Sequence, residues 1–174
     1  MGSHLHLAHT YWKETITPGD LVIDATCGNG HDTLYLTELG AQVVAYDVQE
    51  AAIEATRLKV PNAHFKLQSH AHFDEEEAAL IVYNLGYLPG GDKRRTTQGE
   101  TTLQSVEKAL KIATKAISIT CYPGHPEGAR EEALLLEFLK AIDKKQWTIC
   151  HHQWLNCRAA PSLLWLTKNR KIDH

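Results

Sequence analysis

Apolar runs of strand length alternate with segments of helical character, and this alternation constrains the fold more than any other feature of the chain. The first run, 21–26, follows a Pro18-Gly19-Asp20 turn signal and is typical of a buried strand. Further strands are expected at 42–46, 64–67, 80–83, 117–121, 147–152 and 163–167. Helices are expected at 31–39, 50–59, 101–116 and 127–142. Such an alternation predicts a mostly parallel sheet covered on both faces.

The last two expected strands follow one another without a helix between them, which predicts one antiparallel strand. We therefore predict an α/β fold with a doubly wound, seven-stranded, mostly parallel sheet. Its ligand should bind beyond the carboxyl ends of the first strands, at the topological switch point. The length of 174 residues favours a single domain over 1–174, of which residues 1–4 are expected to include a remnant added by cloning.

The clearest expected helix is 101–116, because apolar side chains recur there at steps of three and four residues. The residues of this apolar face are Leu103, Val106, Leu110, Ala113 and Ile117. Thr101 and Gln104 fit a capping box, so the helix is predicted to begin at Thr101.

The composition excludes several classes of protein. Hydrophobic residues make up 43% and charged residues 22% of the chain, as in a globular enzyme and unlike a disordered chain. No apolar stretch approaches the roughly 20 residues of a membrane span, and no secretory signal is recognisable. The four cysteines form no CxxC pair, which predicts reduced thiols in a cytoplasmic protein. The histidine pairs lack partners at zinc spacing, so no metal site is expected.

The charge is distributed unevenly although the net charge is only −3. Residues 1–87 hold 4 Lys+Arg and 12 Asp+Glu, whereas residues 88–174 hold 14 Lys+Arg and 9 Asp+Glu. A polyanionic partner would therefore dock on the second half. An equally good interpretation is that the helix surfaces of this half are simply rich in lysine.

The first candidate site is the loop between the first strand and the first helix, which reads Asp24-Ala-Thr-Cys-Gly-Asn-Gly30. Gly28 and Gly30 allow a tight turn and a close approach of a ligand. The helix that follows, with Asp32 in its first turn, presents free N–H groups. Asp47 ends the second strand, where a carboxylate can accept both ribose hydroxyls of a nucleoside. The pattern indicates an adenosine-containing cofactor, the alternative being a strand-to-helix turn without a ligand.

The same loop discriminates between cofactors. A dinucleotide fingerprint requires a third glycine, and this chain has Thr33 in its place. Asp24 would repel a pyrophosphate but attract the ammonium of a methionine moiety. The sequence therefore favours S-adenosyl-L-methionine over NAD.

The second candidate site is the loop 84–93, directly after the expected central strand. Amine methyltransferases often carry Asn or Asp, two prolines and an aromatic residue at this place. Asn84 and Tyr87 fit that pattern, whereas Leu85 and Gly86 replace the prolines. The Asn84 side-chain oxygen can accept a hydrogen bond from an amine, and the Tyr87 ring can hold a planar base or face the sulfonium. The alternative is an ordinary glycine loop.

The segments Asp24–Thr33, Ser69-His70 and Asn84–Lys93 with Thr96-Thr97 are similar to those of a small bacterial family labelled "putative rRNA methylase". The segments 122–126 and 156–161 also resemble this family, and the similarity runs over about 7–168. The resemblance implies a Rossmann-like class I methyltransferase that uses S-adenosyl-L-methionine. Members look like the enzymes that N-methylate the 5-aminomethyl group of uridine or 2-thiouridine at the tRNA wobble position. The segment 156–161 departs from the fuller Asn-x-x-Asn-x-Pro-Pro type, which affects the substrate side of the site.

The resemblance also assigns residues to the site. Cys27 and Asn29 would line the cofactor, Asp47 and Gln49 would hold the ribose side, and Ser69 and His70 would lie near the adenine or the methionine end. The alternative interpretation of His70 is a core or surface histidine. The complete expected cofactor set is Asp24, Cys27, Gly28, Asn29, Gly30, Asp32, Asp47, Gln49, Ser69 and His70.

The expected reaction is an in-line methyl transfer to a primary amine that has lost its ammonium proton. The expected catalytic residues are Asn84 and Tyr87, which orient the amine, and Asp92 and His125 as candidate proton acceptors. The expected RNA contacts are Lys93, Arg94, Arg95 and Arg158, which the tail 168–171 either extends or leaves as a solvated end.

The resemblance implies tRNA as the partner. Because a chain of this size has no room for a separate RNA-binding domain, we expect it to bind a short stem-loop, the anticodon stem-loop. A homodimer would widen the binding surface. Other interpretations stay open at this point: an rRNA methyltransferase, a methyltransferase of small amines or proteins, a module that binds the cofactor without catalysis, and an NAD enzyme.

Overall fold

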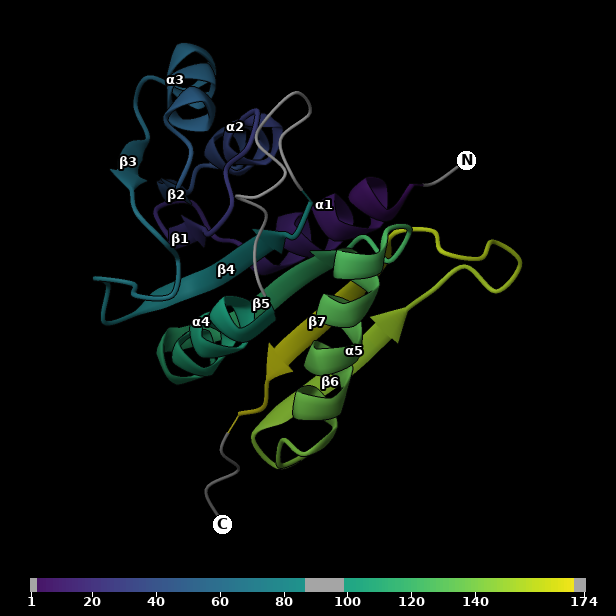
Figure 1. Cartoon of the computed structure of the whole chain (residues 1–174). Helices are drawn as coiled ribbons and strands as arrows, with labels where there is room; N and C mark the ends of the chain where they lie inside the picture. The colour runs from purple at the N-terminus through teal and green to yellow at the C-terminus, as the bar shows by residue number, and fades with distance from the viewer. Residues whose placement is uncertain (1–2, 87–98, 171–174) are drawn as a thin grey trace.

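The computed structural model describes residues 3–86 and 99–170 and contains one seven-stranded sheet in the order β3-β2-β1-β4-β5-β7-β6 (Figure 1). Its strands are β1 Leu21–Asp24, β2 Gln42–Asp47, β3 His64–Leu67, β4 Ala78–Asn84, β5 Ala113–Cys121, β6 Trp147–His152 and β7 Ser162–Lys168. All neighbours pair in parallel except β7, which is antiparallel to both β5 and β6. The predicted fold with its one antiparallel strand is confirmed.

Helices cover both faces of the sheet (Figure 1). They are α1 His4–Thr15, α2 His31–Glu38, α3 Glu50–Lys59, α4 Gly99–Ile112 and α5 Pro126–Lys140. On one face, Trp12 of α1 and Leu36 of α2 pack with Leu80 of β4 in a buried cluster. On the other, Val106 of α4 and Leu135 of α5 pack in a larger one. The sheet is thus buried between two helical layers, as its continuous apolar strands require.

Helix α1 is absent from the sequence-based predictions. Ser3 caps it by accepting a 3.2 Å hydrogen bond from the backbone N–H of His6. Ala8 and Trp12, one turn apart, are its buried residues. Two buried residues among histidines give a weak periodic signal, and the helix is stabilised chiefly by packing of Trp12 against β5 and β7.

The predicted boundary between the helix at 101–116 and the next strand is wrong. Helix α4 has begun by Gly99, so Thr101 lies inside it and the capping box with Gln104 is not its start. The helix ends at Ile112, and Ala113 and Ala116 pair with β4 as part of β5. Alanine favours a helix locally, but here pairing with a buried central strand prevails.

The chain order creates a switch point at β1, whose neighbours are β2 on one side and β4 on the other. The loops after β1, β2, β3, β4 and β5 therefore open at one edge of the sheet, which we call the carboxyl edge. None of the described helices is long and apolar enough to cross a membrane.

Candidate cofactor and substrate site

Asp24 ends β1 and is almost completely buried, at 1% exposure. One carboxylate oxygen accepts a 2.7 Å hydrogen bond from the Thr33 hydroxyl, and the other accepts from the Thr26 backbone N–H at 3.3 Å. Burial, and secondly the negative charge of Asp32, raise the pKa of Asp24 to about 7. Both donors, a backbone N–H and a hydroxyl, are uncharged, so these two hydrogen bonds do not neutralise the carboxylate. The site therefore favours a cationic ligand group beside Asp24.

The two glycines of the loop meet different requirements. Gly30 has φ 84°, and a Cβ there would lie 2.9 Å from Thr56 of α3, so this residue permits close packing of the loop on the helix. Gly28 has φ 52°, and a Cβ there would meet no atom within 4 Å. The backbone at Gly28 thus faces open space that a ligand can enter.

Cys27 and Asn29 lie in the same loop. The Cys27 thiol is buried and accepts a 3.5 Å hydrogen bond from the Thr56 hydroxyl, which directs it toward α3. Burial raises the pKa of this thiol. Asn29 is exposed, and its carbonyl accepts a hydrogen bond from the Lys59 ammonium. The side chain of Cys27 accordingly packs the loop onto α3, and the cofactor contacts expected of both residues stay predictions.

Asp47, at the end of β2, joins the loops after β1 and β2. Its carboxylate accepts from the backbone N–H of Gly28 at 3.2 Å and from that of Gln49 at 2.9 Å. Burial raises its pKa. Each oxygen retains a further lone pair, so the carboxylate can still accept hydroxyl donors such as those of a ribose.

The segment after β3 carries Ser69 and His70. The Ser69 hydroxyl accepts from the Ala71 backbone N–H at 3.2 Å. The His70 ring is buried and packs edge-on against Tyr83, with ring centroids 5.5 Å apart. Burial lowers the pKa of His70 to about 4, so the imidazole is neutral. Its Nδ1 is buried and has no hydrogen-bond partner among the described residues. This nitrogen can therefore form a hydrogen bond with a ligand.

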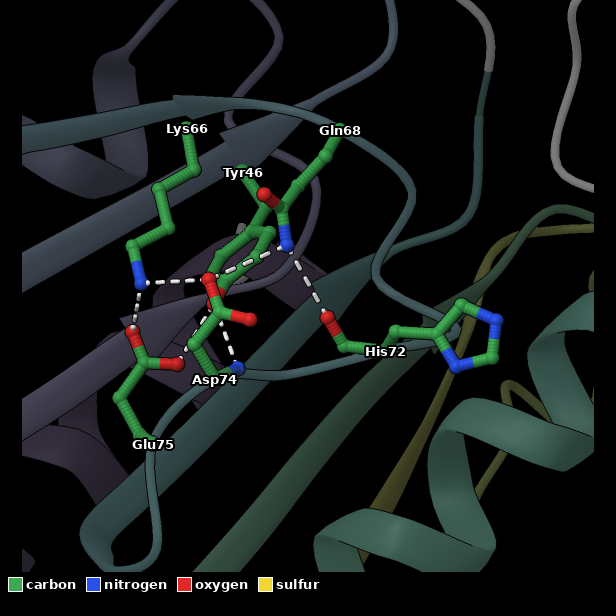
Figure 2. A network of polar contacts seen from close by, with 6 residues as sticks. All are labelled: Tyr46, Lys66, Gln68, His72, Asp74 and Glu75. Atoms are coloured by element: carbon green, nitrogen blue, oxygen red, sulfur yellow. Dashed lines mark hydrogen bonds and ion pairs between the residues drawn. The ribbon is translucent and has the colours of Figure 1, made fainter.

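A network of polar contacts that sequence reasoning missed fastens this segment to the sheet (Figure 2). The buried Tyr46 hydroxyl donates to Glu75 at 2.5 Å and accepts from the Asp74 backbone N–H at 3.2 Å. Lys66 of β3 pairs with Asp74 at 2.9 Å, and the Gln68 side chain donates to the His72 carbonyl at 3.1 Å. The loop that presents Ser69 and His70 is therefore anchored at both of its ends.

Asn84 ends β4 at the carboxyl edge. Its backbone N–H donates a 2.6 Å hydrogen bond to the Thr26 hydroxyl in the loop after β1. Its side chain is hydrogen-bonded to Tyr122, which directly follows β5. The Tyr122 ring lies 3.5 Å from the position of a Cβ on Gly86, so it packs against Gly86. The loop after β1 and the start of the segment after β4 thus meet at Asn84.

Helix α1 supplies a further wall of the site. The Tyr122 hydroxyl lies 3.4 Å from Nε2 of His4, and the His9 ring nitrogen lies 3.0 Å from a carboxylate oxygen of Asp32. Burial lowers the pKa of His4. Sequence reasoning missed His4, His9 and Tyr122, although Tyr122 opens the Tyr-Pro-Gly-His-Pro segment that follows an expected strand.

The other expected catalytic and RNA-binding residues are described only in part. His125 caps α5, with its Nδ1 accepting a 3.1 Å hydrogen bond from the Gly128 backbone N–H. Arg158 is exposed in the loop between β6 and β7. Tyr87, Asp92, Lys93, Arg94 and Arg95 lie outside the described residues. Within the described part, no three His, Cys, Asp or Glu side chains gather as metal ligands.

A doubly wound seven-stranded sheet with an acidic glycine loop after β1 and a carboxylate at the end of β2 defines a class I methyltransferase dependent on S-adenosyl-L-methionine. The model of the family "Putative rRNA methylase" matches residues 43–168, and the chain belongs to this family. The expected class, the family resemblance and the cofactor are thereby confirmed.

Relatives match over nearly the whole chain. A protein of Arabidopsis thaliana named "tRNA (mnm(5)s(2)U34)-methyltransferase, chloroplastic" is 34% identical, over 93% of this chain and 68% of its own length. The crystal structure of a putative rRNA methylase from Clostridium thermocellum has a TM-score of 0.91 at 31% identity and covers 97% of this chain and 98% of its own. The crystal structure of a putative methyltransferase from Streptococcus mutans in complex with SAH has a TM-score of 0.87 at 32% identity. It covers 97% of this chain and 99% of its own.

Proposed function

We propose that this methyltransferase N-methylates the 5-aminomethyl group of uridine or 2-thiouridine at the wobble position of tRNA, which gives 5-methylaminomethyl-uridine. The observation that carries the proposal is the Asn84 side chain, held by Tyr122 at the carboxyl edge beside the cofactor loop. An amide oxygen there suits an amine acceptor, as expected from the sequence. The name of the Arabidopsis relative supports tRNA as the carrier of that amine.

The cofactor is proposed to lie along the loops after β1, β2 and β3. Asp24 would hold the ammonium of the methionine moiety, because its buried carboxylate needs a cation to ionise fully. Asp47 would accept the ribose hydroxyls, with Gln49 beside it. The backbone at Gly28 would pass close to the ligand, and the anchored segment with Ser69 and His70 would contact the adenine side. When bound, S-adenosyl-L-methionine supplies a methyl group on a sulfonium that needs no further activation.

The chain's own contribution to the reaction is to position a neutral amine. The Asn84 side-chain oxygen would accept a hydrogen bond from one N–H of the amine, so that the nitrogen lone pair points to the methyl group. Tyr122 would keep the Asn84 amide in this orientation. The amine loses one proton in forming the neutral secondary amine, and Asp92 or His125 are the proposed acceptors.

The RNA side of the proposal rests on charge. Arg158 is exposed, and Lys93, Arg94 and Arg95 follow the substrate loop directly in the sequence. These four cations would contact phosphates beside the extruded wobble nucleotide of the anticodon stem-loop. We further propose that residues 1–174 act as one domain in the cytoplasm, and that a homodimer widens the surface, which sedimentation with and without tRNA tests.

Methyl transfer from labelled S-adenosyl-L-methionine tests the proposal. Bulk tRNA and, separately, rRNA are taken from cells that lack the enzyme, and labelled nucleosides are identified by mass spectrometry. Label in 5-methylaminomethyl-uridine of tRNA is the expected result. Label only in rRNA would favour the second candidate, an rRNA methyltransferase, which the family's label supports. Label in neither RNA would overturn the RNA proposal and direct the search to small amines and proteins.

A further inference from the structure

The loop 153–161 between β6 and β7, here called the β6–β7 loop, lies at the carboxyl edge of the sheet. Because β7 is antiparallel to β5, its first residue, Ser162, pairs with Cys121 at the end of β5. The β6–β7 loop also contacts the segment after β5, since a Cβ on Gly124 would lie 3.3 Å from the Ala159 carbonyl oxygen. Although it is distant in the sequence, this loop therefore borders the edge that carries Asn84 and Tyr122 (Figure 1).

The tip of the β6–β7 loop exposes large apolar side chains. Trp154 is 46% exposed and Leu155 is fully exposed, at 102%. The three other tryptophans, Trp12, Trp147 and Trp165, are 2%, 4% and 7% exposed. An indole left in water beside a catalytic edge is a candidate contact surface for a flat ligand group.

The charge around this tip favours a polyanion. The β6–β7 loop contains Arg158 and no Asp or Glu. An aromatic ring together with a cation is a combination that proteins use to bind unpaired nucleotides, because the ring stacks on a base and the cation neutralises a phosphate.

The backbone of the β6–β7 loop is also held in shape. Ala159 has φ 57°, the one positive φ of a non-glycine residue in the described ranges 3–86 and 99–170. The Cys157 backbone N–H donates to the Trp154 carbonyl at 3.4 Å, which closes a turn at the tip. At the base, His152 is hydrogen-bonded to the Tyr11 hydroxyl of α1 at 3.0 Å. The tip is thus presented by a defined turn that is anchored to the body of the protein.

We propose that the β6–β7 loop is a substrate-binding element in which Trp154 stacks on an unpaired base of the RNA and Arg158 contacts a neighbouring phosphate. The inference rests on the proposed function only in that the substrate is RNA. Arg158 is already one of the proposed phosphate contacts, and the inference adds to it a stacking contact made by Trp154. Trp154 would hold a base beside the one that is methylated and so fix the register of the stem-loop on the enzyme.

Intrinsic fluorescence offers a direct test, because Trp154 is the exposed member of the four tryptophans. The full chain is titrated with an anticodon stem-loop RNA that carries the 5-aminomethyl group. Stacking should quench the emission of Trp154, and the quenching should be lost in Trp154→Phe. By filter binding, Trp154→Ala should weaken RNA binding about five- to a hundredfold. Arg158→Gln should reduce the salt dependence of binding by the equivalent of about one phosphate contact.

Controls separate this loop from a general surface effect. Leu58→Ala removes an apolar side chain that is 88% exposed on α3 and should leave RNA binding unchanged. The affinity for S-adenosyl-L-methionine should be the same in all four variants. The inference is overturned if the wild-type chain binds and methylates the RNA while Trp154→Ala does both equally well. It is also overturned if Trp154→Ala loses RNA binding only because a dimer dissociates, as sedimentation would reveal. A wild-type chain that binds no RNA would refute the proposed function and this inference together.

Discussion

The Thr33 hydroxyl donates a 2.7 Å hydrogen bond to the buried carboxylate of Asp24, across the turn from β1 into α2. A dinucleotide-binding loop has a glycine at the position of Thr33, where it lets helix and strand pack closely. Here a polar side chain in the same position fixes the carboxylate of Asp24. The negative charge of Asp24, held in place by Thr33, suits an ammonium better than a pyrophosphate.

Cofactor binding should depend on pH through Asp24. Its pKa is about 7 in the folded protein and 3.8 ordinarily, so below pH 7 most molecules carry a neutral acid at this position. An ammonium binds the carboxylate better than the acid, so affinity for S-adenosyl-L-methionine should rise between pH 6 and pH 8. Isothermal titration calorimetry at several pH values measures this. Methylthioadenosine, which lacks the ammonium, should show no such rise, and an equal rise for both ligands would contradict the assignment.

The same group contributes to stability with the opposite sign. Because the folded-state pKa of Asp24 is raised, its contribution to the free energy of unfolding is fully present below about pH 4 and is lost as the pH rises through about 7. In Asp24→Asn this decline should disappear from a series of urea unfolding curves. The variant should also bind the cofactor more weakly at pH 8, with no gain from pH 6.

Asp47→Ala should weaken cofactor binding by about 1–3 kcal/mol, because it removes the acceptor for the ribose hydroxyls. The matched control is Asp143→Ala, since Asp143 accepts a 2.8 Å hydrogen bond from the backbone N–H two residues later, as Asp47 does. Calorimetry gives the affinities, and circular dichroism checks that both variants fold. Equal affinity in the two variants would mean that the ribose lies elsewhere.

The two glycines of the loop should respond differently to alanine. Gly30→Ala places a Cβ against Thr56 and should lower the free energy of unfolding by about 1–3 kcal/mol. Gly28→Ala meets no atom and should cost only about 1 kcal/mol of backbone strain, while it obstructs the cofactor. Thermal unfolding and cofactor titration of both variants separate the two effects. The expectation fails if Gly28→Ala binds the cofactor like the wild-type chain.

Asn84→Ala should retain cofactor affinity and lose turnover by about a hundredfold, because it removes the group that orients the amine. Tyr122→Phe should lower kcat less, since it keeps the Asn84 amide and removes only the hydroxyl that contacts Asn84 and His4. The control is Asn169→Ala. Asn169 follows β7, and its side chain forms hydrogen bonds with Thr148 and Lys144. Steady-state kinetics on tRNA give kcat and KM. Full activity of Asn84→Ala would remove this residue from the site.

Tyr46→Phe tests the anchoring of the segment after β3. The variant leaves the Glu75 carboxylate and the Asp74 N–H without their buried partner and should lower the free energy of unfolding by about 1–3 kcal/mol. Because the loop with Ser69 and His70 loses its anchor, the KM for the cofactor should rise while kcat changes little. Urea unfolding and initial rates are the measurements. A variant with lower stability but an unchanged KM would show that the network serves the fold alone.

Local signals were sufficient for most of the fold. The predicted bounds agree with the structure for the strands 64–67 and 147–152 and for the helix 50–59. Each of these segments has its own pattern of apolar residues, with a turn or helix-breaking residue nearby. The order of the elements then placed Asp24, Asp47 and Asn84 at one edge of the sheet. In a sheet built from strand-helix-strand units, successive parallel strands present their carboxyl ends on the same side.

Only the tertiary structure decided the rest. The alanines at the start of β5 are compatible with a helix, and pairing with β4 made them a strand. Helix α1 has two buried residues and acquires its position from Trp12 in the core, which brings His4 to Tyr122 across 118 residues of sequence. The β6–β7 loop borders the site because β7 returns antiparallel beside β5. Periodicity and turn residues act within a few residues of chain, and so the sequence by itself determined most of the elements and the position of the glycine loop after β1. Contacts between distant elements depend on packing energy that no local pattern contains, and they decided which side chains complete the substrate side.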